Sequence, residues 1–96
     1  MDTPYGWIIT HDLLPPDDPT AAGTIGPSTA SDEDVAQLRV GKGLAFKLID
    51  DDGVVAYHGR LIGQTVSGFE PLDDFGTPNA GCTSIEYFAE GRWRPL

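Results

Sequence analysis

Three carboxylates lie close together in the segment FEPLDDFGTPNAGC, residues 69–82. Asp73 and Asp74 are adjacent, and Glu70 precedes them by one helical turn or one tight loop. A carboxylate pair can divide acid and base roles only where a dry pocket raises one of the two pKa values. The segment is rich in proline and glycine, which is typical of exposed turns. We therefore interpret these carboxylates as surface groups suited to binding.

Cys82 is the single cysteine, and with His58 or His11 it forms the one conceivable nucleophile–base pair. A nucleophilic thiol needs a neighbouring base and surroundings that favour the thiolate. Cys82 instead opens an expected strand, where cysteine ordinarily packs as a small apolar side chain. We predict a buried Cys82 without a catalytic role, and a His58 on the polar face of a hairpin opposite Lys47.

The run Asp50–Asp52 resembles the first half of a calcium-binding loop. Such a loop alternates its ligands and closes with a glutamate, whereas Gly59 and Leu61 occupy the closing positions here. Gly53 follows the run directly, which favours an acidic turn. We predict no cofactor and no dedicated metal site, with a loosely held surface cation as the alternative.

The 96 residues carry 15 acidic and 6 basic side chains, for a net charge of −9. Residues 1–38 hold seven of the acids and no Lys or Arg, so most of the negative field belongs to this part. Such a field repels phosphates and anionic membranes and attracts basic proteins. We expect a basic protein partner and no direct contact with nucleic acid or membrane. An excess of acid that serves only solubility is the alternative.

One cysteine permits no internal disulfide and no zinc knuckle. Residues 1–16 lack the basic segment and long apolar run of a signal peptide. No stretch approaches the ~20 apolar residues of a transmembrane helix. We expect a cytoplasmic protein.

Residues 44–62 contain two apolar runs separated by an acidic turn, which predicts a β-hairpin. With Asp52 and Gly53 as a two-residue loop, Phe46 lies opposite Gly59. One face then carries an apolar set that we expect in the core: Leu44, Phe46, Leu48, Val55, Tyr57 and Leu61. The opposite face carries a mixed set: Ala45, Lys47, Ile49, Ala56, His58, Arg60 and Ile62.

The flanking segments predict shorter elements. The alternating pattern of residues 5–10 indicates a first strand, and residues 24–25 indicate a short edge strand. Ser31 followed by three acids is typical of a helix N-terminus, and Gly41 is typical of a helix end. We predict one helix of about two turns between them. Residues 69–82 are predicted to form a compact loop with its apolar side chains turned inward.

Residues 83–96 predict a second hairpin that turns through a three-residue loop, Ala89 to Gly91. This loop pairs Tyr87 with Trp93 and places both on one apolar face. Aromatic residues concentrate late in the chain, where they form either core or a protein-binding patch: Phe69, Phe75, Phe88 and Trp93. Together the elements predict a mainly β fold in one domain, residues 1–96. Its form is a small antiparallel curled sheet or partly open barrel of four to six strands, with one short helix.

Three segments of the C-terminal half resemble sequences of other proteins: DDGVVAYHGRLIG, FEPLDDFGTPNAGCTSIEYF and GRWRPL. They are similar to small proteins encoded by high-GC bacteria and their phages. The resemblance implies a phage or mobile-element accessory role and assigns no activity to individual residues. Small acidic proteins of that origin include inhibitors that bind nucleic-acid-handling machinery, with carboxylates placed where phosphates would sit.

We therefore expect a non-enzymatic protein-binding module, an inhibitor or regulator that engages a basic, nucleic-acid-handling protein. The candidate partner-binding residues are Glu70, Asp73, Asp74, Phe75, Asp17 and Asp18. Two alternatives stay open. The first is a small ligand-binding or hydrolytic domain with a pocket at residues 69–82 that joins Cys82, His58 and Asp73 or Asp74. The second is a structural subunit of a larger assembly, with exposed aromatic side chains as the contact.

Overall fold

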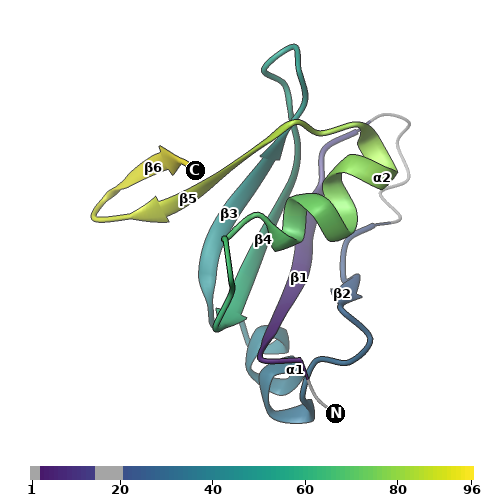
Figure 1. Cartoon of the computed structure of the whole chain (residues 1–96), viewed down its shortest axis with the longest axis vertical. Helices are drawn as coiled ribbons and strands as arrows, with labels where there is room; N and C mark the ends of the chain where they lie inside the picture. Colours follow the sequence, from purple (N-terminus) through teal and green to yellow (C-terminus); the bar gives the residue numbers. More distant parts are fainter. Residues whose placement is uncertain (1–2, 15–20) are drawn as a thin grey trace.

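The computed structural model describes residues 3–14 and 21–96, so Asp17 and Asp18 lie outside the described residues. Within these ranges six strands form one open antiparallel sheet in the order β2-β1-β4-β3-β5-β6 (Figure 1). The strands are β1 Tyr5–Asp12, β2 Ile25–Gly26, β3 Leu44–Ile49, β4 Val55–Gly63, β5 Ser84–Ala89 and β6 Arg92–Pro95. The helical elements are α1 Asp32–Arg39, η1 Leu72–Gly76 and α2 Thr77–Ala80. The predicted mainly β class is confirmed, and the sheet does not close into a barrel.

The β3–β4 hairpin forms the centre of the sheet, with β1 beside β4 and β5 beside β3. Its predicted register is confirmed from Leu44 to Leu48, and Phe46 lies opposite Gly59. Phe46 is fully buried, and its ring lies across the backbone of Gly59, where a side chain would otherwise stand. The absence of a side chain at residue 59 thus makes room for the largest apolar group of β3.

The turn of this hairpin is longer than predicted. The Asp50 N–H donates to the Val54 carbonyl at 3.0 Å, so the loop spans more than Asp52 and Gly53. The Asp50 carboxylate accepts hydrogen bonds from the N–H groups of Asp52 and Val54, both at 2.9 Å. These bonds stabilise the longer turn in place of a two-residue turn. A β-bulge follows, because Ile49 pairs with Val55 while Leu48 pairs with Tyr57.

The bulge and the start of β3 change four predicted positions, one of which is Val55, predicted in the core and only half-buried. Ala56 and Ile49, both predicted on the polar face, are buried, because the bulge interrupts the alternation of side chains. Leu44, predicted in the core, is 44% exposed at the start of β3. Phe46, Leu48, Tyr57 and Leu61 are buried as predicted.

The core lies between the sheet and the η1–α2 segment, which crosses one face of β1 and β4 (Figure 1). The segment 69–82, predicted as a loop, is therefore largely helical: η1 passes into α2, and Gly81, with a φ of 64°, caps the end of α2. Leu72 and Phe75 are buried against the sheet, and this tertiary burial outweighs the local preference for turns. A second helical element is the main difference from the predicted fold.

Helix α1 packs against β1 and β4 on the other face of the sheet. Its predicted cap is confirmed, because the Asp34 N–H donates to the Ser31 hydroxyl at 3.1 Å. Leu38 is buried, and a Cβ added at Gly6 of β1 would lie 3.4 Å from its Cδ1. No helix among the described residues is both long and apolar enough to cross a membrane.

The β5–β6 hairpin departs from its predicted register by one residue. Glu90 and Gly91 have φ angles of 55° and 81° and form a two-residue turn, so Phe88 pairs with Trp93. The predicted pairing of Tyr87 with Trp93 is wrong. Because a shift of one residue moves a side chain to the opposite face, Trp93 leaves the face that holds Tyr87.

We predict that Gly59→Ala lowers the free energy of unfolding by about 3 kcal/mol, because the new methyl group would overlap the Phe46 ring, whose Cε1 lies 2.7 Å from its position. Gly6→Ala is the matched control in the neighbouring strand, where the nearest atoms lie at 3.3 and 3.4 Å. We expect the control to change stability by less than about 1 kcal/mol. Urea denaturation measures both variants, and equal effects would contradict the role of residue 59.

Candidate functional site

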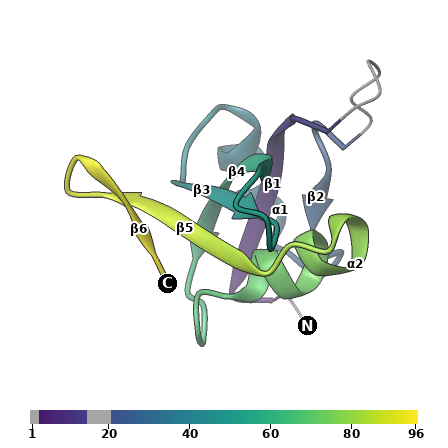
Figure 2. The same ribbon diagram turned by 90° about the horizontal axis from the view of Figure 1, so that it is seen from above.

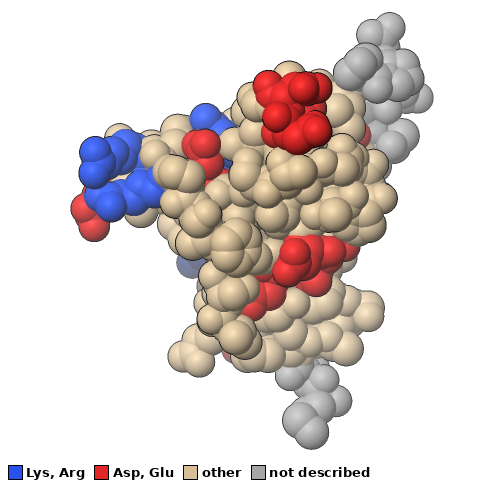
Figure 3. Space-filling view, turned by 45° about the horizontal axis from the view of Figure 1, so that its top comes forward, with Lys and Arg blue, Asp and Glu red and all other residues tan. Residues whose placement is uncertain are grey.

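Acidic side chains gather over two elements on one side of the molecule, which we call the acidic face: Asp50, Asp51 and Asp52 in the β3–β4 turn, and Asp73 and Asp74 in η1. Figure 3 shows two separate acidic groups there, over the β3–β4 turn and over the η1–α2 segment, and basic side chains at the β5–β6 hairpin. Asp73 and Asp74 stand in the first turn of η1 and are exposed. Burial of Leu72 and Phe75 turns this acidic pair outward.

Asp74 has an internal role as well as an exposed surface. Its Oδ2 accepts hydrogen bonds from the Tyr5 hydroxyl and from the Trp7 indole N–H, both at 3.0 Å. These bonds attach η1 to β1. Burial raises the pKa of Tyr5 to about 12, and the hydrogen bond to Asp74 and its charge add to the effect. Among the described residues, the neighbouring Asp73 carboxylate accepts no hydrogen bond.

Glu70 also serves the local structure. Its carboxylate accepts the N–H of Val66 at 2.7 Å and the N–H of Ser67 at 3.3 Å. Burial acts to raise the pKa of Glu70, but the backbone N–H donors outweigh it, so that the pKa is lowered. The carboxylate therefore closes the connection that leads from β4 into η1.

Phe75 lies in the core and not on the surface, with 7% of it exposed. Its ring centroid is 5.4 Å from that of Trp7 and 4.9 Å from that of Tyr57. Four of the six candidate residues lie in the described part of the chain. Of these four, Asp73 is the one that is exposed and whose carboxylate accepts no hydrogen bond from the described residues. Glu70 and Asp74 are bonded internally, and Asp17 and Asp18 lie outside the described residues.

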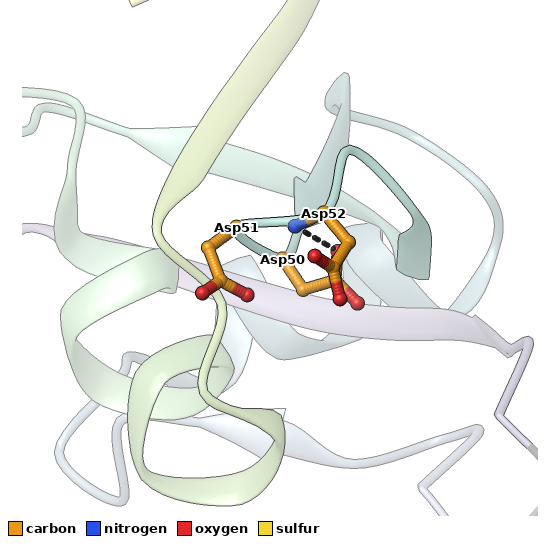
Figure 4. A group of neighbouring side chains, drawn as sticks. All are labelled: Asp50, Asp51 and Asp52. Atoms are coloured by element: carbon orange, nitrogen blue, oxygen red, sulfur yellow. Dashed lines mark hydrogen bonds between the residues drawn. The ribbon is translucent and has the colours of Figure 1, made fainter.

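The Asp50–Asp52 run forms a turn, as predicted. The three carboxylates lie within 4.8 Å of one another (Figure 4). The Asp50 carboxylate is directed toward the backbone N–H of Asp52, and Asp51 and Asp52 are exposed. The hydrogen bonds of the turn account for the position of the Asp50 carboxylate.

The groups of the hydrolytic alternative do not come together. Cys82 is 1% exposed within the core, and burial, with a contribution from Asp50, raises the pKa of its thiol. His58 follows the buried Tyr57 in β4, and successive residues of a strand point to opposite faces. The sheet therefore separates the thiol from the imidazole, while Asp73 is exposed beyond the helical layer.

A second cluster lies on the sheet face opposite η1 and α2, and it contains the predicted Lys47–His58 pair together with residues that the sequence did not place beside it. We call it the open face; its residues are His11, Lys47, His58, Phe88 and Trp93. The Trp93 ring centroid is 5.2 Å from that of Phe88 and 6.0 Å from that of His58. The Lys47 ammonium lies over the Trp93 ring, 4.3 Å from its centroid. The contact with His58 is made although β6 is three positions from β4 in the sheet. The sheet is therefore curled, and Figure 2 shows the β5–β6 hairpin reaching away from the other strands.

His58 faces two other potentially positive groups. Burial lowers its pKa first, and the proximity of His11 and Lys47 lowers it further. The imidazole is therefore neutral over a wider pH range than that of an exposed histidine. The predicted three-residue hairpin loop puts Trp93 on the opposite face of the sheet, so the sequence does not place it beside His58. The Glu90–Gly91 dipeptide, which suits a two-residue turn with positive φ, was the available signal.

No family model matches the chain, and neither curated proteins nor solved structures give a significant match. The function is therefore inferred from the geometry and charge of these two surfaces.

We predict that Asp74→Ala destabilises the fold by about 1.5–3 kcal/mol, because the buried indole N–H of Trp7 loses a charged acceptor. The pKa of Tyr5 also falls below its value of about 12. Asp73→Ala, one residue away, is the control and changes stability by no more than about 0.5 kcal/mol. Chemical denaturation and tyrosine NMR titration measure the two effects. Equal destabilisation by both variants would refute the structural role of Asp74.

We predict that a thiol reagent modifies native Cys82 at least a hundredfold more slowly than it modifies the denatured chain, because modification requires an opening of the core. A spectrophotometric thiol assay with and without denaturant measures the two rates. Rapid modification of the native protein would show that the thiol is accessible, contrary to its burial.

Proposed function

We propose that the chain is a non-enzymatic protein-binding module whose acidic face engages a basic, nucleic-acid-handling protein as an inhibitor or regulator. The observation that supports this proposal most is the grouping of Asp50–Asp52 and Asp73–Asp74 on one side of the molecule, while Arg92 and Arg94 lie on β6. A cytoplasmic setting and a phage or mobile-element origin belong to the same proposal.

The carboxylates of the acidic face are partly fixed before any partner arrives. Asp50 is held by backbone N–H groups at 2.9 Å, and Asp74 is held by Tyr5 and Trp7. Each carboxylate that is held in this way loses little conformational entropy on binding. It can also steer a basic surface toward it and raise the association rate. Fixed carboxylates on a β-rich scaffold are thus suited to occupy a surface that otherwise binds phosphates.

The experiment compares two double variants that remove the same amount of charge. Asp51→Asn with Asp73→Asn alters the acidic face at two exposed residues whose carboxylates form no hydrogen bond among the described residues. Asp32→Asn with Glu33→Gln alters the exposed first turn of α1 and serves as the control. A partner is captured from extract of the native host at low salt, purified, and measured by surface plasmon resonance.

We expect the acidic-face variant to bind about tenfold more weakly, which is about 1.4 kcal/mol, and the α1 control to lose less than about threefold. Raising NaCl from 50 to 500 mM should slow association of the wild-type protein by tenfold or more. Binding that is insensitive to salt, or that falls equally in both variants, would count against the proposal.

A further inference from the structure

The two histidines of the chain face each other across neighbouring strands on the open face. His11 in β1 is the direct pairing partner of His58 in β4, and their ring centroids are 5.8 Å apart. A β-bulge between Ile9 and His11 creates this pairing, because it inserts Thr10 as an extra residue. Without the bulge, Thr10 would stand opposite His58.

The separation of the two rings is close to that of a chelating pair. Two imidazoles bound to one ion at 2.0–2.1 Å with a tetrahedral angle have ring centres about 5 Å apart. The observed 5.8 Å exceeds this value by less than an ångström. His11 is exposed and His58 is half-buried, so the His11 side chain is free to turn about its Cα–Cβ bond and bring its ring closer to that of His58.

A neighbouring hydroxyl can orient the exposed ring. The Nδ1 of His11 lies 2.9 Å from the Thr10 hydroxyl oxygen. When this hydroxyl accepts a hydrogen bond from the Nδ1–H group, the free lone pair of the His11 ring is on Nε2. Metal-binding histidines commonly have their second nitrogen held in this manner. The bulge therefore supplies both the pairing and a hydroxyl group in contact with Nδ1 of His11.

We propose that His11 and His58 form a two-ligand site for a divalent transition-metal ion such as Zn²⁺ or Ni²⁺. Imidazole nitrogen suits these ions, whereas Ca²⁺ and Mg²⁺ prefer oxygen ligands. Water completes the coordination sphere. Lys47, which pairs with His58 across β3 and β4, opposes the ion by its charge and limits the affinity. This site is independent of the acidic face and of its proposed partner.

The experiment uses Ni²⁺ as the probe and the full chain without an affinity tag. Isothermal titration calorimetry gives the affinity, and NMR locates the ion by paramagnetic broadening. The Trp93 ring lies 6.0 Å from His58, while Trp7 is buried on the other face of the sheet. We expect the Trp93 indole N–H signal to broaden at lower Ni²⁺ concentrations than the Trp7 signal.

His11→Gln and His58→Gln should each weaken Ni²⁺ binding at least tenfold. Lys47→Met should strengthen it several-fold, and Lys42→Met, an exposed residue outside the sheet, should leave it unchanged. Because His11 is exposed, its variant decides the matter even if the His58 variant does not fold. Binding that survives His11→Gln, or that falls with Asp51→Asn and Asp52→Asn instead, would overturn the proposal and assign the ion to the acidic turn. Failure of the acidic-face experiment would leave this result unaffected.

Discussion

Phe46 is buried across the backbone of Gly59, and the arrangement of the sheet depends on this contact. Any other residue at position 59 would force the ring or the strand to move. With this pair in place, Leu48 must lie opposite Tyr57 and Lys47 must lie opposite His58. The same contact that fills the core therefore assigns the polar side chains of the hairpin to the open face.

The parts of the fold that depend on local signals could be predicted from the sequence. The register of β3 and β4 follows from alternating apolar residues, and α1 follows from Ser31, its acids and Gly41. The segment 69–82 could not be predicted, because its helical form depends on burial of Leu72 and Phe75 against strands distant in sequence. The position of Trp93 was missed because it rests on one residue of loop length.

The candidate site was predicted in part for a similar reason. The sequence shows an excess of carboxylates and the adjacency of Asp73 and Asp74. It cannot distinguish an exposed carboxylate from one that accepts hydrogen bonds within the fold. In the structure, Asp74 accepts hydrogen bonds from β1 and Glu70 from its own connection, while Asp73 stands exposed. Asp73 and Asp74 thus have different roles although they are adjacent, because their side chains leave η1 in different directions.

The two edge strands of the described sheet, β2 and β6, are poorly suited to pair with a further strand. β2 has two residues and is followed directly by Pro27. β6 carries Arg92 and Arg94 and ends at Pro95, which has no backbone N–H. A further strand can gain few main-chain hydrogen bonds at either border. Under the proposed function, binding would therefore depend on side chains, and a partner would have to match their charge and shape because it could not simply add a strand to the sheet.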